Sequence, residues 1–134
     1  MRDFLNHEKH ENFLYKDESY NILGAAFEVY KEMGSGFLEA VYQECMEREL
    51  ILRQIPFESQ KRLQLLYKNQ PLATQYVPDL ICYGKIIIEI KALKAIKPEH
   101  EAQLINYLKS TSIKLGLIVN FGSPRKAEIL RKAF

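Results

Sequence analysis

Cysteines and long apolar runs are both scarce in this sequence of 134 residues. Cys45 and Cys82 are far apart and form no CxxC unit, so neither a zinc site nor a disulfide framework is predicted, and both are expected to be buried thiols. No uninterrupted apolar run approaches the roughly 20 residues that a membrane span needs. Met1 to Asn12 alternates charge with Phe and Leu and contains no signal-peptide core. These absences predict a soluble protein of the cytoplasm.

The composition is that of a globular domain. Hydrophobic residues make up 47% of the chain and charged residues 27%, which excludes a disordered, collagen-like or low-complexity chain. Ordinary domains run to roughly 100–200 residues, so residues 1–134 are expected to form one domain, with 1–16 as an N-terminal extension. Residues 1–56 carry a net charge of −5 and residues 57–134 a net charge of +7. The second half could present a positive face to a polyanion, although a charge run is more often only a solvated surface.

Apolar spacing predicts eight elements in the order α-α-β-β-β-α-β-α. Three- and four-residue steps indicate helices over 17–33 and 37–53, separated by the turn Gly34-Ser35-Gly36. Strands are expected over 57–67, 75–82, 86–91 and 114–120. The strand over 86–91 is almost continuously apolar, as in a strand covered on both faces. A helix is expected from Pro98 to about Ser110, and a short basic helix over 124–132.

Two charged residues interrupt the isoleucine-rich strand. Glu89 and Lys91 are two positions apart, so they project from the same face. Burying either charge costs several kcal/mol unless something compensates it. One interpretation is a simple ion pair at the end of the sheet, where water reaches it. The other is a metal site that includes Asp79 from the preceding strand.

The turn between the two strands decides whether Asp79 joins Glu89. A three-residue loop with Gly84 in the left-handed conformation would put the two carboxylates on one face, either opposed or one diagonal step apart. A two-residue loop would put them on opposite faces. Pro78 suggests that regular pairing stops just before Asp79. Facing carboxylates repel each other unless a cation lies between them, and such hard oxygen ligands suit Mg²⁺ or Mn²⁺.

Helix geometry adds two further candidates. On a helical wheel of the second helix, Glu39 falls inside the apolar arc and is expected to point inward, but Glu49 falls in the same arc, so spacing alone does not single out Glu39. In the later helix, His100, Gln103 and Tyr107 share one side. Buried amides usually serve backbone groups, so Gln103 is either an ordinary hydrogen-bonding residue or part of a site.

In order along the chain, these residues resemble the signature of the PD-(D/E)xK nuclease superfamily, with its αβββαβ core. The signature would comprise Pro78-Asp79 and Glu89-Ile90-Lys91, with Glu39 on a preceding helix and Gln103 on a following one. More narrowly, residues 36–42 (GFLEAVY) match the GxxExxY string of a family of small bacterial and archaeal proteins in that superfamily. Residues 100–104 and 117–122 are also similar to that family. The resemblance covers Ser19 to Arg131.

The resemblance implies a mixed α/β (α+β) fold with a restriction-endonuclease-like core, an extra N-terminal helix and a short C-terminal helix. It also implies a Mg²⁺-dependent nuclease, with Mn²⁺ as an alternative ion, acting on nucleic acid that is expected to be DNA. Asp79 and Glu89 would be the metal ligands, with Glu39 as an additional ligand or a supporting acid. Lys91 would be the catalytic lysine, and Gln103 would support the site.

Basic side chains of the second half are candidate phosphate contacts. They are Lys61, Arg62, Lys94, Lys97, Arg125, Lys126, Arg131 and Lys132. A chain of this size has little material for a sequence-reading domain, which favours structure-selective or partner-directed cleavage. Cutting both strands of a duplex requires two sites or two visits, which favours a homodimer.

Two other interpretations compete with a nuclease. The same fold could serve as a noncatalytic module that binds nucleic acid or a partner protein, because fold does not fix function. Alternatively, the charged residues could form a purely structural ion-pair cluster. In that case Asp79→Ala would lower stability and Mg²⁺ would not change it.

Overall fold

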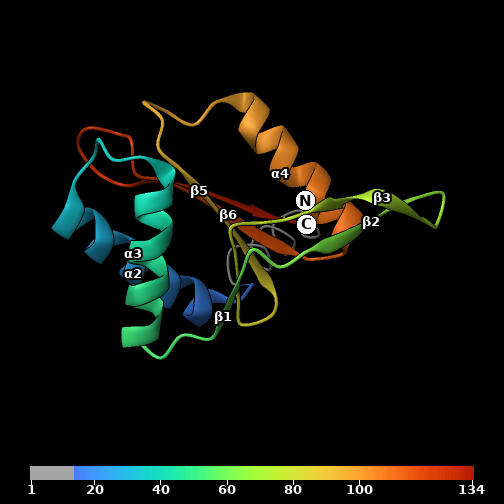
Figure 1. The fold of residues 1–134 in the computed structure, drawn as a ribbon, viewed down its shortest axis with the longest axis horizontal. Coiled ribbons are helices and arrows are strands. Elements are labelled where there is room, and N and C mark those ends of the chain that lie inside the picture. Colours follow the sequence, from blue (N-terminus) through green and yellow to red (C-terminus); the bar gives the residue numbers. More distant parts are fainter. Residues whose placement is uncertain (1–13) are drawn as a thin grey trace, which may run out of the picture.

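A computed structural model describes residues 14–134, and it shows a central sheet with helices packed on both faces (Figure 1). The helices are α2 (Lys16–Met33), α3 (Glu39–Leu52) and α4 (Pro98–Thr111). Most of the predicted N-terminal extension, residues 1–13, lies outside the described residues. Within residues 14–134, none of the helices has the length and apolar character required to cross a membrane.

The main sheet has five strands in the order β1-β4-β5-β6-β7. The central strand β5 (Ile86–Lys91) pairs antiparallel with β4 (Leu80–Cys82) and parallel with β6 (Leu115–Asn120). A parallel pair needs a crossover connection, and α4 supplies it. The outer strands β1 (Phe57–Ser59) and β7 (Glu128–Ala133) are both antiparallel to their neighbours. This arrangement covers β5 on both faces and explains its run of isoleucines.

A second, two-stranded sheet is formed by β2 (Leu63–Tyr67) and β3 (Gln70–Tyr76), which make an antiparallel hairpin. Lys68 and Asn69 connect the strands, and both have left-handed backbone conformations with φ of 49° and 63°. Two left-handed central residues are typical of a tight hairpin turn that matches the twist of its strands. In Figure 1 the hairpin extends away from the main sheet at the end opposite α2 and α3.

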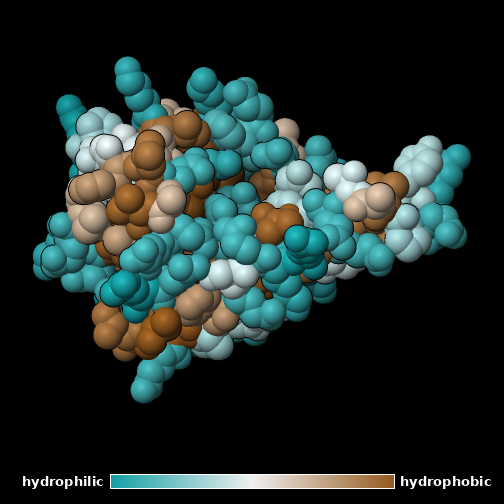
Figure 2. Space-filling model, in the orientation of Figure 1, coloured by the Kyte–Doolittle hydropathy of each residue, from teal (hydrophilic) through white to brown (hydrophobic). Residues whose placement is uncertain are grey.

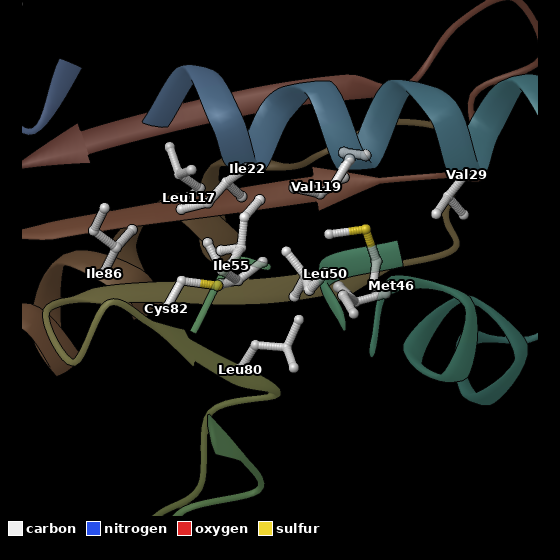
Figure 3. Close-up of a cluster of buried hydrophobic side chains, with 14 of the residues drawn as sticks. Ile22, Val29, Met46, Leu50, Ile55, Leu80, Cys82, Ile86, Leu117 and Val119 are labelled. Atoms are coloured by element: carbon white, nitrogen blue, oxygen red, sulfur yellow. The ribbon is translucent and has the colours of Figure 1, made fainter. Parts of the chain in front are cut away.

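Alternating residues of β5 supply two cores. Ile86, Ile88 and Ile90 face α2 and α3, where they join a large cluster that includes Met46 and Leu50 (Figure 3). On the other face, Ile87 packs with Leu104 and Leu108 of α4. Because side chains alternate along a strand, Glu89 and Lys91 lie on the same face as Ile87, the face that α4 covers.

Helices and strands are confirmed at most predicted places, including 17–33, 86–91, 98–110 and 114–120. The predicted C-terminal helix over 124–132 is wrong, because these residues form a turn and β7. Strand β6 would otherwise leave an open edge, and pairing along all six of its residues outweighs the local helical pattern.

The predicted strands over 57–67 and 75–82 are each broken in two. Between β1 and β2, Gln60 adopts a left-handed conformation with φ of 54°, so the chain leaves the main sheet there. Between β3 and β4, Pro78 has no N–H to donate to a neighbouring strand. The chain therefore leaves the main sheet at Gln60, forms the hairpin, and rejoins the main sheet after Pro78.

Candidate active site

The loop between β4 and β5 has three residues, Tyr83 to Lys85, and Gly84 is left-handed with φ of 68°. This is the loop that places Asp79 and Glu89 on one face. The register pairs Leu80 with Ile88, and one step further along both strands brings Asp79 opposite Glu89. The three-residue alternative of the sequence analysis is therefore the loop observed, and its register favours the opposed arrangement of the two carboxylates.

Regular strand pairing ends at Asp79, whose side chain accepts a hydrogen bond from the backbone of β5. Its Oδ2 accepts a hydrogen bond of 2.7 Å from the backbone N–H of Ile90, and its carbonyl oxygen accepts one of 3.0 Å from Nε2 of Gln43. The backbone N–H of Gln60 donates to the same carbonyl at 3.3 Å. Residues from α3, the β1–β2 connection and β5 thus fix the position of Asp79.

Glu89 is held by an aromatic pair on the α4 side of the sheet. The hydroxyl of Tyr76 donates a 2.6 Å hydrogen bond to Oε1 of Glu89, and its ring stacks on Tyr107 of α4 with 3.6 Å between centroids. Burial and the charge of Asp79 raise the pKa of Glu89, whereas Tyr76 and Lys91 lower it, and the net result is a pKa of about 7. The charge of Asp79 therefore disfavours the ionised form of Glu89.

Lys91 lies beside this pair. It is half-buried on the strand two residues after Glu89, and its positive charge acts on the Glu89 carboxylate. The Lys91 carbonyl accepts a 2.8 Å hydrogen bond from the N–H of Phe121, which fixes the end of β5 against the segment after β6. The ammonium is thus available at the edge of the site from a rigid strand.

Glu39 is the first residue of α3, and it is exposed. The prediction that it points into the core is wrong, because the helix begins at residue 39 and not at 37, so that Phe37 and Leu38 lie before the helix and are also exposed. Nevertheless, Glu39 and Asp79 line the same open pocket of about 230 Å³. Glu39 thus faces the candidate site across solvent.

The turn before α3 explains why Glu39 reaches this place. Gly36 has φ of 113°, a conformation that disfavours any residue with a Cβ. The hydroxyl of buried Tyr42 donates to the carbonyl of Gly34 at 2.6 Å and accepts from the N–H of Phe37 at 3.2 Å. The glycine and the tyrosine of the GxxExxY string therefore shape the turn that positions its glutamate.

Gln103 is exposed on α4, and the structure does not bring it together with the two opposed carboxylates by any hydrogen bond among residues 14–134. The α4 residue that reaches the site is Tyr107, one turn later, through its contact with Tyr76. His100, on the same side, has a structural role, because its Nδ1 accepts a 3.0 Å hydrogen bond from the N–H of Lys97 at the start of the helix.

The candidate phosphate contacts fall into two groups. Arg62, Lys94, Lys97, Arg125 and Lys126 are exposed without an ion-pair partner among the described residues. The others are already engaged: Lys61 with Glu58, Lys132 with Glu101, and Arg131 with the carbonyl of Leu14. The first group therefore remains the better set of candidate phosphate contacts.

The donor set fits a hard divalent cation. Among residues 14–134, no group of three or more His, Cys, Asp and Glu side chains is arranged to hold a metal, so Glu39 does not complete a set with Asp79 and Glu89. However, Mg²⁺ is commonly held by one or two carboxylates and keeps several of its waters. Asp79, which lines the open pocket, together with the neighbouring Glu89 meets that requirement. A larger pocket of about 370 Å³, which Asn21, Arg53 and Tyr83 help to line, has no carboxylate in its lining.

Sequence reasoning missed three residues that hold the site. Gln43 contacts the Asp79 carbonyl and Tyr76 the Glu89 carboxylate, while Tyr107 supports Tyr76. Two of them had a usable signal, since Gln43 is one helical turn after Glu39 and Tyr107 one turn after Gln103. Tyr76 had none, because its role depends on the hairpin base lying over β5.

Taken together, the fold and the site define a restriction-endonuclease-like α/β domain, with an acid pair and a lysine on adjacent antiparallel strands of a mixed sheet. A model of the PD-(D/E)XK nuclease superfamily matches residues 16–132, and the chain belongs to that superfamily. None of the curated proteins compared with this chain matches it.

Among solved structures, the chain is similar to the one titled "Crystal structure of SSO0001". The TM-score is 0.55 and the sequence identity 20%, and the similarity covers 70% of this chain and 48% of that chain. This chain therefore matches about half the length of that protein. At this level of identity, the similarity shows the fold alone.

Proposed function

We propose that this chain is a metal-dependent nuclease that hydrolyses phosphodiester bonds in DNA. The feature that supports the proposal is that Asp79, hydrogen-bonded to the N–H of Ile90, and Lys91 both lie close enough to Glu89 for their charges to act on it. Membership of the nuclease superfamily supports it. The match of residues 36–42 to GxxExxY supports assignment to that narrower family, and the cytoplasm is the proposed compartment.

In this proposal Asp79 and Glu89 hold Mg²⁺ or Mn²⁺, with Glu39 as a supporting acid on the far side of the pocket. When bound, such an ion lowers the pKa of a coordinated water and neutralises charge on the phosphate. Tyr76 and the N–H of Ile90 keep the two carboxylates in place, each by a hydrogen bond to one oxygen. The remaining carboxylate oxygens are left to face the ion.

Lys91 has the second role in this chemistry. Its ammonium orients the attacking water and stabilises the negative charge that develops on the phosphate. It does so from a rigid central strand, so little reorganisation is required. Exposed Lys94 and Lys97 follow in the next loop, where they contact phosphates along the strand to be cut.

Calorimetric titration of Mn²⁺ or Mg²⁺ into wild type and into an Asp79→Asn/Glu89→Gln variant tests the proposal. Both proteins are then incubated with single-stranded, nicked and duplex DNA. Glu32→Gln is the matched control, because it removes an exposed carboxylate on α2. Saturable binding and cleavage should be present in wild type and control and absent from the double variant.

A wild-type protein that is folded, binds neither ion and cuts none of these substrates would overturn the proposal. The noncatalytic module would then be the function to pursue. Structure-selective cleavage and a homodimer remain predictions within the proposed function, and the three DNA substrates test the first of them.

A further inference from the structure

The β2–β3 hairpin, residues 63–76, is here called the arm. Its base is packed, since Leu63 and Leu65 lie against the cluster formed by Leu104 and Leu108 of α4. Within residues 14–134, β2 and β3 pair only with each other along their whole length. A two-stranded hairpin that extends beyond the core buries little of its own surface, so its outer half is available to a partner.

Both ends of the arm meet the candidate active site. Just before β2, the N–H of Gln60 donates to the carbonyl of Asp79. At the end of β3, Tyr76 donates to the carboxylate of Glu89. A ligand that lies along the arm therefore leads directly to the opposed carboxylates.

The charge of the arm and its flanks has one sign. From Ser59 to Pro78 the sequence has no Asp or Glu, although this segment contains Lys61, Arg62 and Lys68. Lys61 pairs with Glu58, but Arg62 and Lys68 have no carboxylate partner among the described residues. Such a surface complements a polyanion.

The tip of the arm adds exposed apolar and aromatic surface. Tyr67 is 63% exposed and Leu66 is 49% exposed, although neither serves the core. The ammonium of Lys68 lies 5.6 Å from the centroid of the Tyr67 ring. In the space-filling view the arm projects from the body as a finger, with apolar residues among hydrophilic ones (Figure 2). Exposed aromatics next to cations are the means by which proteins bind unpaired bases and their phosphates together.

We propose that the arm binds an unpaired stretch of nucleic acid and directs it to the candidate active site. Tyr67 stacks on a base, and Arg62 and Lys68 contact phosphates on either side. In a continuous duplex the faces of the bases are covered by their neighbours, so the Tyr67 ring finds a free face only where the bases are unpaired. The choice of nucleic acid as the partner rests on the proposed function, and the arm defines the substrate class as single strands, flaps or junctions.

Fluorescence anisotropy in EDTA tests the arm, because binding is then measured without metal-dependent cleavage. The probes are a labelled single strand of DNA, the same sequence as RNA, and the blunt DNA duplex. The variants are Tyr67→Ala and Tyr67→Phe, and Tyr20→Ala is the matched control, since Tyr20 is an exposed tyrosine on α2. Circular dichroism confirms that each variant is folded.

Tyr67→Ala is expected to weaken binding to a single strand about tenfold, while Tyr67→Phe keeps a stacking ring and binds as wild type does. Duplex binding should be unchanged by either. A binding affinity that depends on Tyr67, for either the DNA or the RNA strand, supports the proposal. The strand that shows this dependence identifies whether the arm binds DNA or RNA. Lys68→Ala and Arg62→Ala should each lower the slope of log K against log salt by about 0.7, as expected for one lost contact to a single strand.

Two results would overturn the role of the arm: equal binding of duplex and single strand by wild type, or unchanged single-strand affinity in Tyr67→Ala. Neither result bears on cleavage by Asp79 and Glu89, which is measured separately in the presence of metal. Conversely, wild type could cut no substrate while Tyr67→Ala loses single-strand binding. That result would support the proposed role of the arm and contradict the proposed nuclease activity.

Discussion

Glu89 is half-buried, faces a second carboxylate, and yet receives a hydrogen bond from Tyr76. A group this constrained makes folding depend on pH. Because the pKa of Glu89 is raised to about 7 from its ordinary value of 4.5, the native state keeps its proton at pH values where the unfolded chain has lost it. The contribution of Glu89 to stability is therefore complete below pH 4.5 and is lost as the pH rises to about 7.

The expected result for wild type without divalent ions is a fall in the free energy of unfolding between these two pH values, by at most about 3 kcal/mol. Glu89→Gln keeps an acceptor for the Tyr76 hydroxyl and has no proton to lose, so this part of the fall should be missing. Urea unfolding of both proteins at several pH values in EDTA measures it. Identical pH dependence in the two would show that Glu89 titrates normally.

The chemistry of single residues was also the most predictable part of the site. Glu89, Lys91 and Asp79 stood out because charges are rare in apolar strands, but the sequence left open whether a three-residue loop joins Asp79 to them or a two-residue loop separates it. Glu39 lines the same pocket as Asp79, but the prediction that it points into the core is wrong. Its helix begins two residues later than the apolar pattern suggested, and a wheel drawn from residue 37 cannot show that.

Among the elements, β7 is the one for which the local sequence pattern predicts the wrong secondary structure. Ile129 and Ala133 pack against the α2–α3 side, whereas Leu130 packs with the α4 side. A strand with apolar residues on both faces has no simple alternation, and its short sequence looks equally helical. Only the open edge of β6, which is not visible in the local sequence, decides between the two.

The connection between β5 and α4 depends on a close backbone approach. Oδ1 of buried Asn120 accepts hydrogen bonds from the N–H groups of Leu93, at 2.8 Å, and Gly122, at 3.1 Å. A Cβ added to Gly122 would lie 2.2 Å from the Leu93 carbonyl oxygen. This contact fixes the loop that leads from Lys91 to Lys94.

Gly122→Ala is therefore expected to lower the free energy of unfolding by about 1–3 kcal/mol, because backbone must move to relieve the overlap. Gly24→Ala is the matched control, since the nearest atom there belongs to the flexible side chain of Arg53, at 3.0 Å. In the interior of a helix that change should stabilise by up to about 1 kcal/mol. Chemical denaturation should give opposite signs for the two variants, and equal effects would contradict the role assigned to Gly122.

Across the whole molecule, the site joins parts of the chain that are distant in sequence. Asp79 is held by α3, by the segment before the arm and by β5, so an ion bound to it would stabilise the entire fold. The size of the effect follows from mass action, at about 2.7 kcal/mol when the ion is present at 100 times its Kd.

Saturating Mn²⁺ or Mg²⁺ should thus raise the Tm of wild type by roughly 10 °C. The rise should be larger at pH 8 than at pH 6, because ion binding displaces the proton from Glu89. Differential scanning calorimetry compares wild type with Asp79→Asn/Glu89→Gln, in which no rise is expected. An equal rise in the double variant would place the ion elsewhere on the protein.

Only Val77 and Pro78 separate the end of the arm from Asp79. The two ends of the hairpin therefore differ in how freely they can change length. At the tip, residues can be gained or lost in pairs without altering the register below. At the base, a single residue inserted between Asp79 and Leu80 would turn Asp79 to the opposite face of the sheet, away from Glu89. The same hairpin is thus free to diversify at one end and is fixed at the other, so that new ligand preferences can arise without rebuilding the carboxylate pair.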